Sequence, residues 1–393
     1  MTPISRRSFL TGTLAAALAG PAWREALAAK VGKERGAAPP PAGGELLNGV
    51  PFLDEPDLVF DQVLGAGLSG RRYLDLATLK DGDTVTPAER FFIRTTTPAR
   101  LDTRRYWTLS WGTAGHPPRD LPLKELLPLV KPQGVHLLES VENGKDSRWG
   151  LISTADWGGI SFTDLFTQVG RPEGSAYLLA TGNDSHITPH ADPTGGASWI
   201  FKVDDLLAAG AFLATEMNGQ PLADDHGYPL RLVVPGWYGC TWIKWLQSLL
   251  VVPETEEATS QMKEYAERTF QSGVPKRAQG YYPALVEPAA VPVRVERWKV
   301  GGKVLFRVSG LQWGGAKPAR SLQIRFSPGE DFRPVSHFAP AQSAATWQLW
   351  HHDWQPKKAG VYTLDLQIDG SRLRTRRLSQ GVYTRSVRIR AGK

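Results

Sequence analysis

The segment EMNGQPLADDHGYPLRLVVPGWYGCTWIKWL, at residues 216–246, says most about the fold of this chain. Its centre, YPLRLVVPGWYG, is rich in apolar residues and ends in a Pro and Gly turn, which is typical of a buried strand that runs into a turn. His226 and Arg231 stand beside and within this strand, and Lys244 follows the turn. Taken as residue types alone, His226 and Arg231 indicate a hydrogen-bonded pair that fixes a loop.

Strand-like and helix-like segments alternate around this stretch, between about residues 86 and 252. RFFIRTTT and YWTLSW have strand patterns, whereas PLKELLPLV and SFTDLFTQVG have helical ones. For the second helix, Ser161 or Thr163 is the candidate N-cap and Gly170 the expected stop. Strands and helices that interleave through irregular connections predict an α+β domain with a mixed sheet.

Beyond residue 284 the pattern changes to strands separated by Gly and Pro turns. Tyr362, Leu364, Leu366 and Ile368 alternate with polar residues at period two, the mark of a half-buried antiparallel sheet. Such strands predict a small sandwich of about a hundred residues. Since 393 residues exceed what one hydrophobic core usually serves, we expect folded domains at 85–253 and 285–393, a connector at 254–284, and a linker with an N-terminal extension at 29–84.

The first 28 residues have the pattern of an export signal. Arg6 and Arg7 precede a mildly apolar segment, and Ala26 and Ala28 form an A-x-A-like cleavage site. This indicates a twin-arginine signal peptide at 1–28 and a periplasmic protein. The apolar part is too short to cross a bilayer, so no membrane span is expected. Because this route carries proteins already folded, often with a cofactor inserted, it favours a cofactor-containing protein.

The cysteine count and the charge distribution narrow the function classes further. Cys240 is the single cysteine, so neither an intramolecular disulfide nor a cysteine pair for covalent haem or an iron–sulfur cluster is available. No haem is expected, and electrons would pass to a separate carrier. The formal charge of +7 is spread along the chain without a reading motif or a clustered basic face, so no nucleic-acid partner is expected.

Five segments in the same order resemble the sulfite oxidase family of molybdopterin oxidoreductases, over roughly residue 86 to the C-terminus. They are RFFIRTTTP at 90–98, ESVENG followed by ISTADWGGISFTDLF, DPTGGAS at 192–198, the 216–246 stretch, and TWQLWHHDWQPKKAGVYTL. The resemblance implies an α+β fold, in which a mixed α/β cofactor domain of the sulfite oxidase type is followed by an immunoglobulin-like dimerisation domain. It also implies one pyranopterin that holds molybdenum, a small anionic substrate such as sulfite, and a homodimer or a pairing with a homologue.

The resemblance assigns site residues by position. Arg94 matches the arginine beside the substrate pocket, and Ser140 stands where the family has the cysteine that ligates molybdenum. Lys145 replaces an arginine, which keeps the charge but loses the bidentate fork, so sulfite should bind less well. Ser198, with Trp199 next to it, replaces a pocket tyrosine. The residues matched to the pterin and its phosphate are Thr95, Thr96, Asp184, His226, Arg231, Trp242, Ile243 and Lys244.

Arg94, Ser140, Lys145 and Trp199 are therefore the candidate catalytic residues, and Ser140 is the candidate metal ligand. A serine hydroxyl has a pKa far above that of a thiol, so Ser140 would bind metal only if the metal itself removes the proton. Cys240 stands where the family has an apolar residue, and it indicates a small buried filler.

Two functions fit these residues. The first is an exported oxidoreductase similar to sulfite oxidase or sulfite dehydrogenase, which acts on a small oxyanion or a related sulfur or nitrogen compound and passes electrons to a periplasmic carrier such as a cytochrome c. Arg148 would help Arg94 and Lys145 to attract the anion. The second is a non-catalytic partner or binding subunit that has lost the molybdenum centre.

Two less specific readings start from His186 and His190. Either could serve Ser140 as the base of a serine hydrolase, although the G-x-S-x-G turn is missing. The two histidines could also hold zinc, although Pro189 between them opposes the helix that this spacing needs. The role of His186 and His190 stays open.

Overall fold

The computed structural model describes residues 40–66, 69–80, 82–95, 106–173, 176–184, 196–338, 345–370, 375–377 and 383–390. All of them belong to one contact-defined unit that begins at Ala38. The predicted signal peptide, residues 29–39 of the predicted linker, Thr96, His186 and His190 lie outside the described residues.

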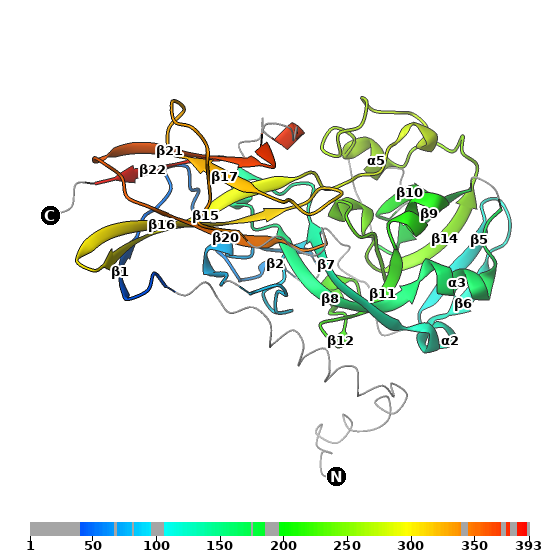
Figure 1. Ribbon diagram of the computed structural model, residues 1–393. Coiled ribbons are helices and arrows are strands. Elements are labelled where there is room, and N and C mark those ends of the chain that lie inside the picture. The colour runs from blue at the N-terminus through cyan, green and yellow to red at the C-terminus, as the bar shows by residue number, and fades with distance from the viewer. Residues whose placement is uncertain are drawn as a thin grey trace, which may run out of the picture. The chain divides into compact units, whose positions relative to one another are not determined.

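One sheet of the N-terminal part is mixed. Its strand order is β10-β9-β14-β5-β6, and β14 pairs with β5 in parallel while the other neighbours are antiparallel. The mixed sheet predicted from the interleaved pattern is confirmed. In Figure 1 β9, β14 and β5 lie side by side. The strands are β5 (Thr108–Thr113), β6 (Arg119–Pro122), β9 (Tyr177–Gly182), β10 (Ser198–Lys202) and β14 (Leu246–Val252).

The second sheet is antiparallel and carries the segments that matter most for the site. Its order is β12-β11-β8-β7, and β13 pairs with β11 as a side branch. The buried strand predicted inside the 216–246 stretch is β13, whose three residues are all buried. The strands are β7 (Lys131–Glu139), β8 (Ile152–Ser161), β11 (Phe212–Met217), β12 (Gln220–Pro221) and β13 (Arg231–Val233).

The helices of this part are short. In α3 (Phe162–Val169) the Ser161 hydroxyl accepts a hydrogen bond from the Asp164 backbone N–H, and the helix stops at Gly170, which has φ 86°. The predicted cap and stop are confirmed. The PLKELLPLV segment forms only α2 (Leu123–Leu126) and the 3₁₀ turn η2 (Leu127–Leu129), because Pro128 cannot continue an α-helix. The other α-helices are α4 (Val203–Ala208) and α5 (Ser260–Glu264).

Further 3₁₀ turns and one small sheet connect these elements. The turns are η1 (Leu76–Thr78), η3 (Lys145–Ser147), η4 (Asp224–His226), η5 (Gly239–Thr241) and η6 (Ala278–Gly280). The small sheet has the order β2-β3-β4, with β2 (Leu64–Ala66), β3 (Ser69–Arg72) and β4 (Ile93–Arg94). It places Arg94 at the end of a paired strand, where the pairing with Arg71 fixes its backbone.

Two sheets of the C-terminal part share one hydrophobic core. Leu364, Leu366 and Ile368 are buried in it, as the period-two pattern predicts, and so are Trp350 and Val308. That the pair of sheets is of the immunoglobulin type stays a prediction. One sheet has the order β1-β15-β16-β20-β19 and the other β18-β17-β21-β22.

One strand of these two sheets, β1, comes from the N-terminal extension. It pairs with β15 and forms an edge of the first sheet (Figure 1). The first sheet consists of β1 (Gly44–Gly49), β15 (Ala289–Val300), β16 (Lys303–Trp313), β19 (His337–Phe338) and β20 (Gln348–Trp354). The second consists of β17 (Leu322–Arg325), β18 (Arg333–Pro334), β21 (Gly360–Ile368) and β22 (Thr384–Ile389).

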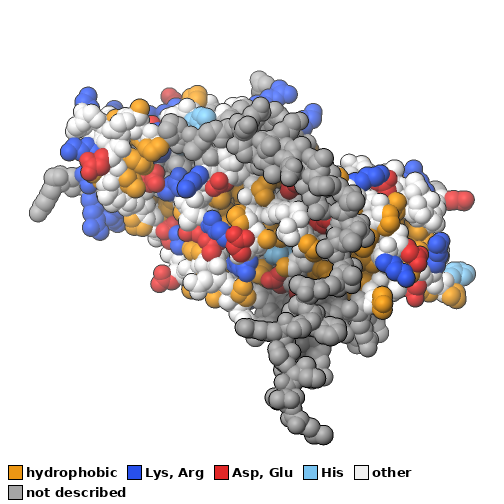
Figure 2. All heavy atoms as spheres, turned by 90° about the horizontal axis from the view of Figure 1, so that it is seen from below, with side chains coloured by type: hydrophobic (Ala, Val, Ile, Leu, Met, Phe, Trp, Pro, Cys, Tyr) orange, Lys and Arg blue, Asp and Glu red, His pale blue; other side chains and the backbone are white. Residues whose placement is uncertain are grey.

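The surface carries charges of both signs. On the face drawn in Figure 2, Lys and Arg side chains lie among Asp and Glu side chains, so the coloured part of that face has no field of a single sign. Among the described residues no helix has both the length and the apolar character that crossing a bilayer requires.

Candidate functional site

A cavity lies where several strands begin or end. Arg94 is the last residue of β4, Ser140 follows β7, Asp184 follows β9, Arg231 begins β13, and Lys244 precedes β14. The space free of protein atoms is ≈ 850 Å³ when the open solvent at its mouth is included. The lining includes most of the residues that the resemblance assigned: Arg94, Thr95, Ser140, Asp184, His226, Arg231, Trp242, Ile243 and Lys244.

Three basic side chains, His226, Arg231 and Lys244, form what we call the cationic wall of this cavity. Arg231 Nη1 donates to the His226 carbonyl at 3.0 Å, and Nη2 donates to the Trp242 carbonyl at 3.4 Å. The guanidinium carbon lies 5.5 Å from the centre of the Trp157 ring. Lys244 Nζ donates to the Asp225 carbonyl at 2.6 Å. The wall is therefore held by neutral backbone carbonyls and aromatic rings.

The charges of this wall are poorly compensated. Among the described residues, neither Arg231 nor Lys244 forms an ion pair with a carboxylate, and Arg231 Nε has no hydrogen-bond partner. Burial lowers the pKa of Arg231 to about 9. Burial, together with the neighbouring Arg231 charge and against the attraction of Asp225 and Asp184, lowers the pKa of Lys244 to about 7. Burial and the charges of Lys244 and Arg231 hold the pKa of His226 well below its ordinary value. A bound anion would remove this penalty.

A glycine lets the two cations of the wall approach each other. Gly227 has φ +102°, a conformation that side chains rarely adopt, and a Cβ there would lie 3.0 Å from Lys244 Cβ and 3.2 Å from Arg231 Cβ. Gly227 follows directly on η4, whose last residue is His226. The HGYPLR segment therefore brings Arg231 and Lys244 to one surface.

A phosphate-bearing pterin fits this arrangement. Its phosphate would satisfy the unpartnered Arg231 Nε and the buried charge of Lys244, since such groups bind phosphate well. Phe91 and Trp242 in the lining give apolar surface for the ring system. Within the described ranges no three His, Cys, Asp or Glu side chains gather as a metal site. Ser140, in the cavity lining, stays the candidate protein donor to a metal.

Ser140 lies on a tightly hydrogen-bonded loop, residues 139–143. Its Oγ accepts from the Glu142 backbone N–H at 3.2 Å, and its own N–H donates to the Leu151 carbonyl at 2.9 Å. Asn143 Nδ2 donates to Glu139 Oε1 at 3.0 Å, while Asn143 Oδ1 accepts from the Leu151 N–H at 3.0 Å. These bonds hold the Ser140 hydroxyl at the cavity surface.

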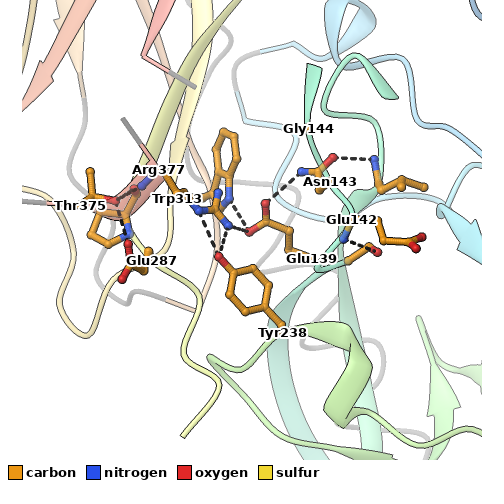
Figure 3. A network of polar contacts seen from close by, with 12 residues as sticks. Glu139, Glu142, Asn143, Gly144, Tyr238, Glu287, Trp313, Thr375 and Arg377 are labelled. Carbon is orange, nitrogen blue, oxygen red and sulfur yellow. Dashed lines mark hydrogen bonds and ion pairs between the residues drawn. The ribbon is translucent and has the colours of Figure 1, made fainter. Parts of the chain in front are cut away.

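The loop is also anchored to the C-terminal part through Glu139. Figure 3 shows its carboxylate between Asn143 on one side and Arg377, Trp313 and Tyr238 on the other. Arg377 Nη2 donates to Glu139 Oε2 at 2.7 Å and to the Tyr238 hydroxyl at 2.6 Å, and Trp313 Nε1 donates to Glu139 Oε2 at 2.8 Å. The Arg377 and Glu139 side chains are only 4% and 1% exposed. This buried ion pair fixes the backbone one residue before Ser140.

Arg94 faces a carboxylate in the cavity. Its Nη2 donates to Glu142 Oε1 at 3.0 Å, its Nε donates to Glu142 Oε2, and Arg268 Nη1 donates to Glu142 Oε1 at 3.1 Å. Burial alone would raise the pKa of Glu142, but the hydrogen bonds and charges of Arg94 and Arg268 outweigh it and lower that pKa. Glu142 was not among the residues expected at the site; it stands in the ESVENG segment, where the resemblance to the sulfite oxidase family implies a small residue.

Two candidate catalytic residues do not line the cavity. Lys145 begins η3, and its side chain is half exposed with Nζ 3.5 Å from Asp54 of the N-terminal extension. Arg148, expected beside it, pairs with Glu55 at 3.0 Å. Trp199 is buried and packs edge-on against Tyr281 at a centroid distance of 6.3 Å. These side chains instead contact the N-terminal extension and the protein core.

The cavity also contains polar residues that were not expected to line it. Cys240, expected as a buried filler, lines the cavity near Ser140, and burial raises the pKa of its thiol. Tyr265, just beyond α5, lines it as well, and burial raises the pKa of its phenol. Gln261 in α5 donates to the Cys240 carbonyl and accepts from the Ser198 N–H. Only the folded chain brings α5 to this cavity, so no local pattern marks these residues.

Comparisons with known proteins identify the family to which this chain is similar. Residues 95–260 match the family model for the oxidoreductase molybdopterin binding domain. The chain is 30% identical over 320 residues to the mitochondrial sulfite oxidase of Macaca fascicularis, over 72% of this chain and 55% of that protein. It is 30% identical over 304 residues to the mitochondrial sulfite oxidase of Homo sapiens, over 68% of this chain and 52% of that protein. The chain thus spans about half the length of these relatives.

A solved structure has a similar fold. The sulfane dehydrogenase SoxCD from Paracoccus pantotrophus matches with a TM-score of 0.59 and 18% sequence identity, over 82% of this chain and 79% of that chain. The sheet-rich fold, the cationic wall and the matched domain define a molybdopterin-binding oxidoreductase domain. The chain belongs to the sulfite oxidase family of molybdopterin oxidoreductases, which confirms the family predicted from its motifs.

Proposed function

We propose that this protein is an exported molybdopterin-dependent oxidoreductase that carries out redox chemistry on a small sulfur compound or a related compound. The observation that carries the proposal is the cationic wall, where Arg231 and Lys244 are buried without an ion-pair partner among the described residues. Buried charges without an ion-pair partner add little net stability, so a chain that never bound an anion there would have no stability reason to keep them. The wall therefore favours a cofactor-binding protein over a non-catalytic subunit without a molybdenum centre.

Each group of residues has a role in this proposal. Arg231, Lys244 and His226 would hold the phosphate end of the pterin, with Thr95, Asp184, Trp242 and Ile243 along the same cavity. The bound molybdenum–pterin would supply two-electron redox chemistry. Ser140 would offer one oxygen donor from a loop that Asn143 and Glu139 hold in place.

Tyr265 and the apolar lining would act on the substrate. Because burial raises its pKa, the Tyr265 phenol keeps its proton at neutral pH and remains an uncharged polar group in the cavity lining. Leu138, Val141 and Phe92 line the same cavity and would limit the access of water to a bound substrate. Substrate orientation would therefore depend on a neutral polar group and on shape.

Export, electron transfer and assembly complete the proposal. The Arg6–Arg7 pattern and the small residues that follow support twin-arginine export to the periplasm. A single cysteine in the sequence supports a separate electron carrier, such as a cytochrome c, over a covalently attached haem. The paired C-terminal sheets would serve as the dimerisation domain.

The test starts from the full chain, produced in a host that makes the cofactor. The loaded protein is titrated with a reductant and then reoxidised, and the absorbance change is compared with that of the Arg231→Met protein. We expect reversible uptake of two electrons per metal in the wild-type protein, followed by turnover with at least one member of a panel of small sulfur and nitrogen compounds. A loaded protein that takes up no electrons would end the redox proposal.

A further inference from the structure

Glu142 occupies the donors of Arg94 that an oxyanion would use. The Nε and Nη2 groups of Arg94 each donate to a different oxygen of the Glu142 carboxylate. This side-on geometry is how a guanidinium binds a carboxylate or a tetrahedral oxyanion. Both side chains line the cavity and are mostly buried, with 21% and 27% of their surfaces exposed. A small oxyanion at this place would have to displace Glu142.

Glu142 is held firmly where it is. Arg268 Nη1 binds the same carboxylate from the other side at 3.1 Å, and the Glu142 backbone N–H donates to Ser140 Oγ at 3.2 Å. Displacing the carboxylate would therefore break charge-assisted bonds to two arginines. An oxyanion that bound without displacing it would meet arginine charges that the carboxylate already compensates, so it would gain little attraction.

The other cations expected to attract an anion offer no replacement. Lys145 lies beside Asp54, Arg148 pairs with Glu55, and neither lines the cavity. Among the described residues around Ser140, Arg94 and Glu142 line the cavity, Arg268 binds Glu142 from behind, and the charge of Glu264 acts on Arg94, so that two positive charges stand against two negative ones. Tyr265 and Cys240 in the same lining are neutral at pH 7, because burial raises their pKa values. The cavity thus has two electrostatically different ends, the cationic wall and a neutral end near Ser140.

We propose that Glu142 is a specificity-determining residue, which closes Arg94 to small oxyanions and selects an uncharged polar substrate. That the cavity binds a substrate rests on the proposed function, whereas the pairing of Glu142 with Arg94 rests on the geometry alone. An uncharged substrate needs neither the donors of Arg94 nor the displacement of Glu142. The family resemblance pointed to an anion such as sulfite, and the Arg94 to Glu142 pairing argues against that substrate.

The experiment measures sulfate binding by calorimetry in four full-length proteins: wild type, Glu142→Gln, Arg94→Gln and the double variant. We expect Arg94→Gln to change the sulfate affinity of the wild type by less than twofold, because Arg94 already holds a carboxylate. Glu142→Gln should bind sulfate at least tenfold more tightly than the wild type, and the double variant should lose that gain. Any sulfate that binds at the cationic wall binds in all four proteins, so it does not contribute to the differences in affinity between them.

Two results would overturn the inference. One is a wild-type affinity that falls tenfold or more in Arg94→Gln, which would show that Arg94 is open to oxyanions. The other is a Glu142→Gln protein without a gain in affinity. Glu142→Gly, which restores a small residue, is a second variant in case the glutamine protein folds poorly. Molybdenum and pterin are measured on the same preparations, so that loss of the proposed function is seen separately from loss of the Glu142 effect.

Discussion

Replacing Arg231 with methionine should separate stability from cofactor binding. In the cofactor-free protein, the shift of the Arg231 pKa from 12.5 to about 9 corresponds to a cost of about 5 kcal/mol for the buried charge, at 1.36 kcal/mol per pKa unit. The substitution removes this cost and also two hydrogen bonds from a charged donor to carbonyls, together worth about 3–6 kcal/mol. The two terms nearly cancel, so the free energy of unfolding should change by less than about 2 kcal/mol.

Cofactor retention should respond strongly to the same change. An arginine bound to phosphate supplies charge-assisted hydrogen bonds, and their loss should weaken pterin binding by at least about thirtyfold, or about 2 kcal/mol. Unfolding in urea measures the stability of protein made without cofactor synthesis. The fluorescence of the acid-oxidised pterin measures retention in protein made with it.

A matched control is Arg307→Met in β16. Arg307 is mostly buried but pairs with Asp353 through bonds of 2.7 and 2.8 Å, away from the cavity. It should lose about 1–3 kcal/mol of stability and keep its pterin. The reasoning is refuted if Arg231→Met retains wild-type pterin content, or if it lowers the stability of the cofactor-free protein by more than about 3 kcal/mol.

Three further predictions concern the wall, the loop and its anchor. The pKa of Lys244 is about 7 without a bound anion, and phosphate monoesters are dianions above about pH 6, so above pH 7 such an ester must bind together with a proton that Lys244 takes up. The affinity for the ester, measured by calorimetry, should therefore fall by up to about tenfold per pH unit above pH 7. An affinity that does not change between pH 7 and 9 contradicts this prediction. Ser140→Ala, which removes the candidate metal donor, should lower the molybdenum-to-pterin ratio at least twofold, whereas Ser140→Cys, which keeps a donor atom, should preserve it. Equal ratios by elemental analysis in the wild type and both variants exclude Ser140 as a ligand. Arg377→Met should lower the free energy of unfolding by about 3–5 kcal/mol, because Glu139 is left as a buried charge without a partner. A loss below about 1 kcal/mol would show that the fold does not depend on the Arg377 to Glu139 pair for its stability.

Local patterns predicted the local structure well. Ser161 and Gly170 bound α3 because capping and a left-handed stop depend on neighbouring residues alone. The period-two burial of Leu364 and Leu366 follows from the pleat of a single strand. The resemblance of the 216–246 segment to the sulfite oxidase family, and not a local pattern, implied that His226, Arg231 and Lys244 belong to one site, and all three line the cavity.

The parts of the site that depend on distant residues were not predictable. Glu142 meets Arg94 across 48 positions of the sequence, and Arg377 meets Glu139 across 238. No period or spacing records such pairs. Lys145 has the residue type expected for anion binding, but the η3 turn carries it toward Asp54 of the N-terminal extension. The sequence shows that Lys145 is charged, but it does not show in which direction the side chain points.

The most direct test of the central claim is the amount of molybdenum and pterin in the full-length protein. The protein is purified after export from a host that makes the cofactor, and both components are quantified per chain beside the Arg231→Met variant. An uncompensated cationic wall that holds the phosphate of a pterin predicts nearly one molybdenum and one pterin per wild-type chain, with a large loss of both in the variant. A wild-type protein with almost no pterin, or a variant with as much as the wild type, would contradict the claim.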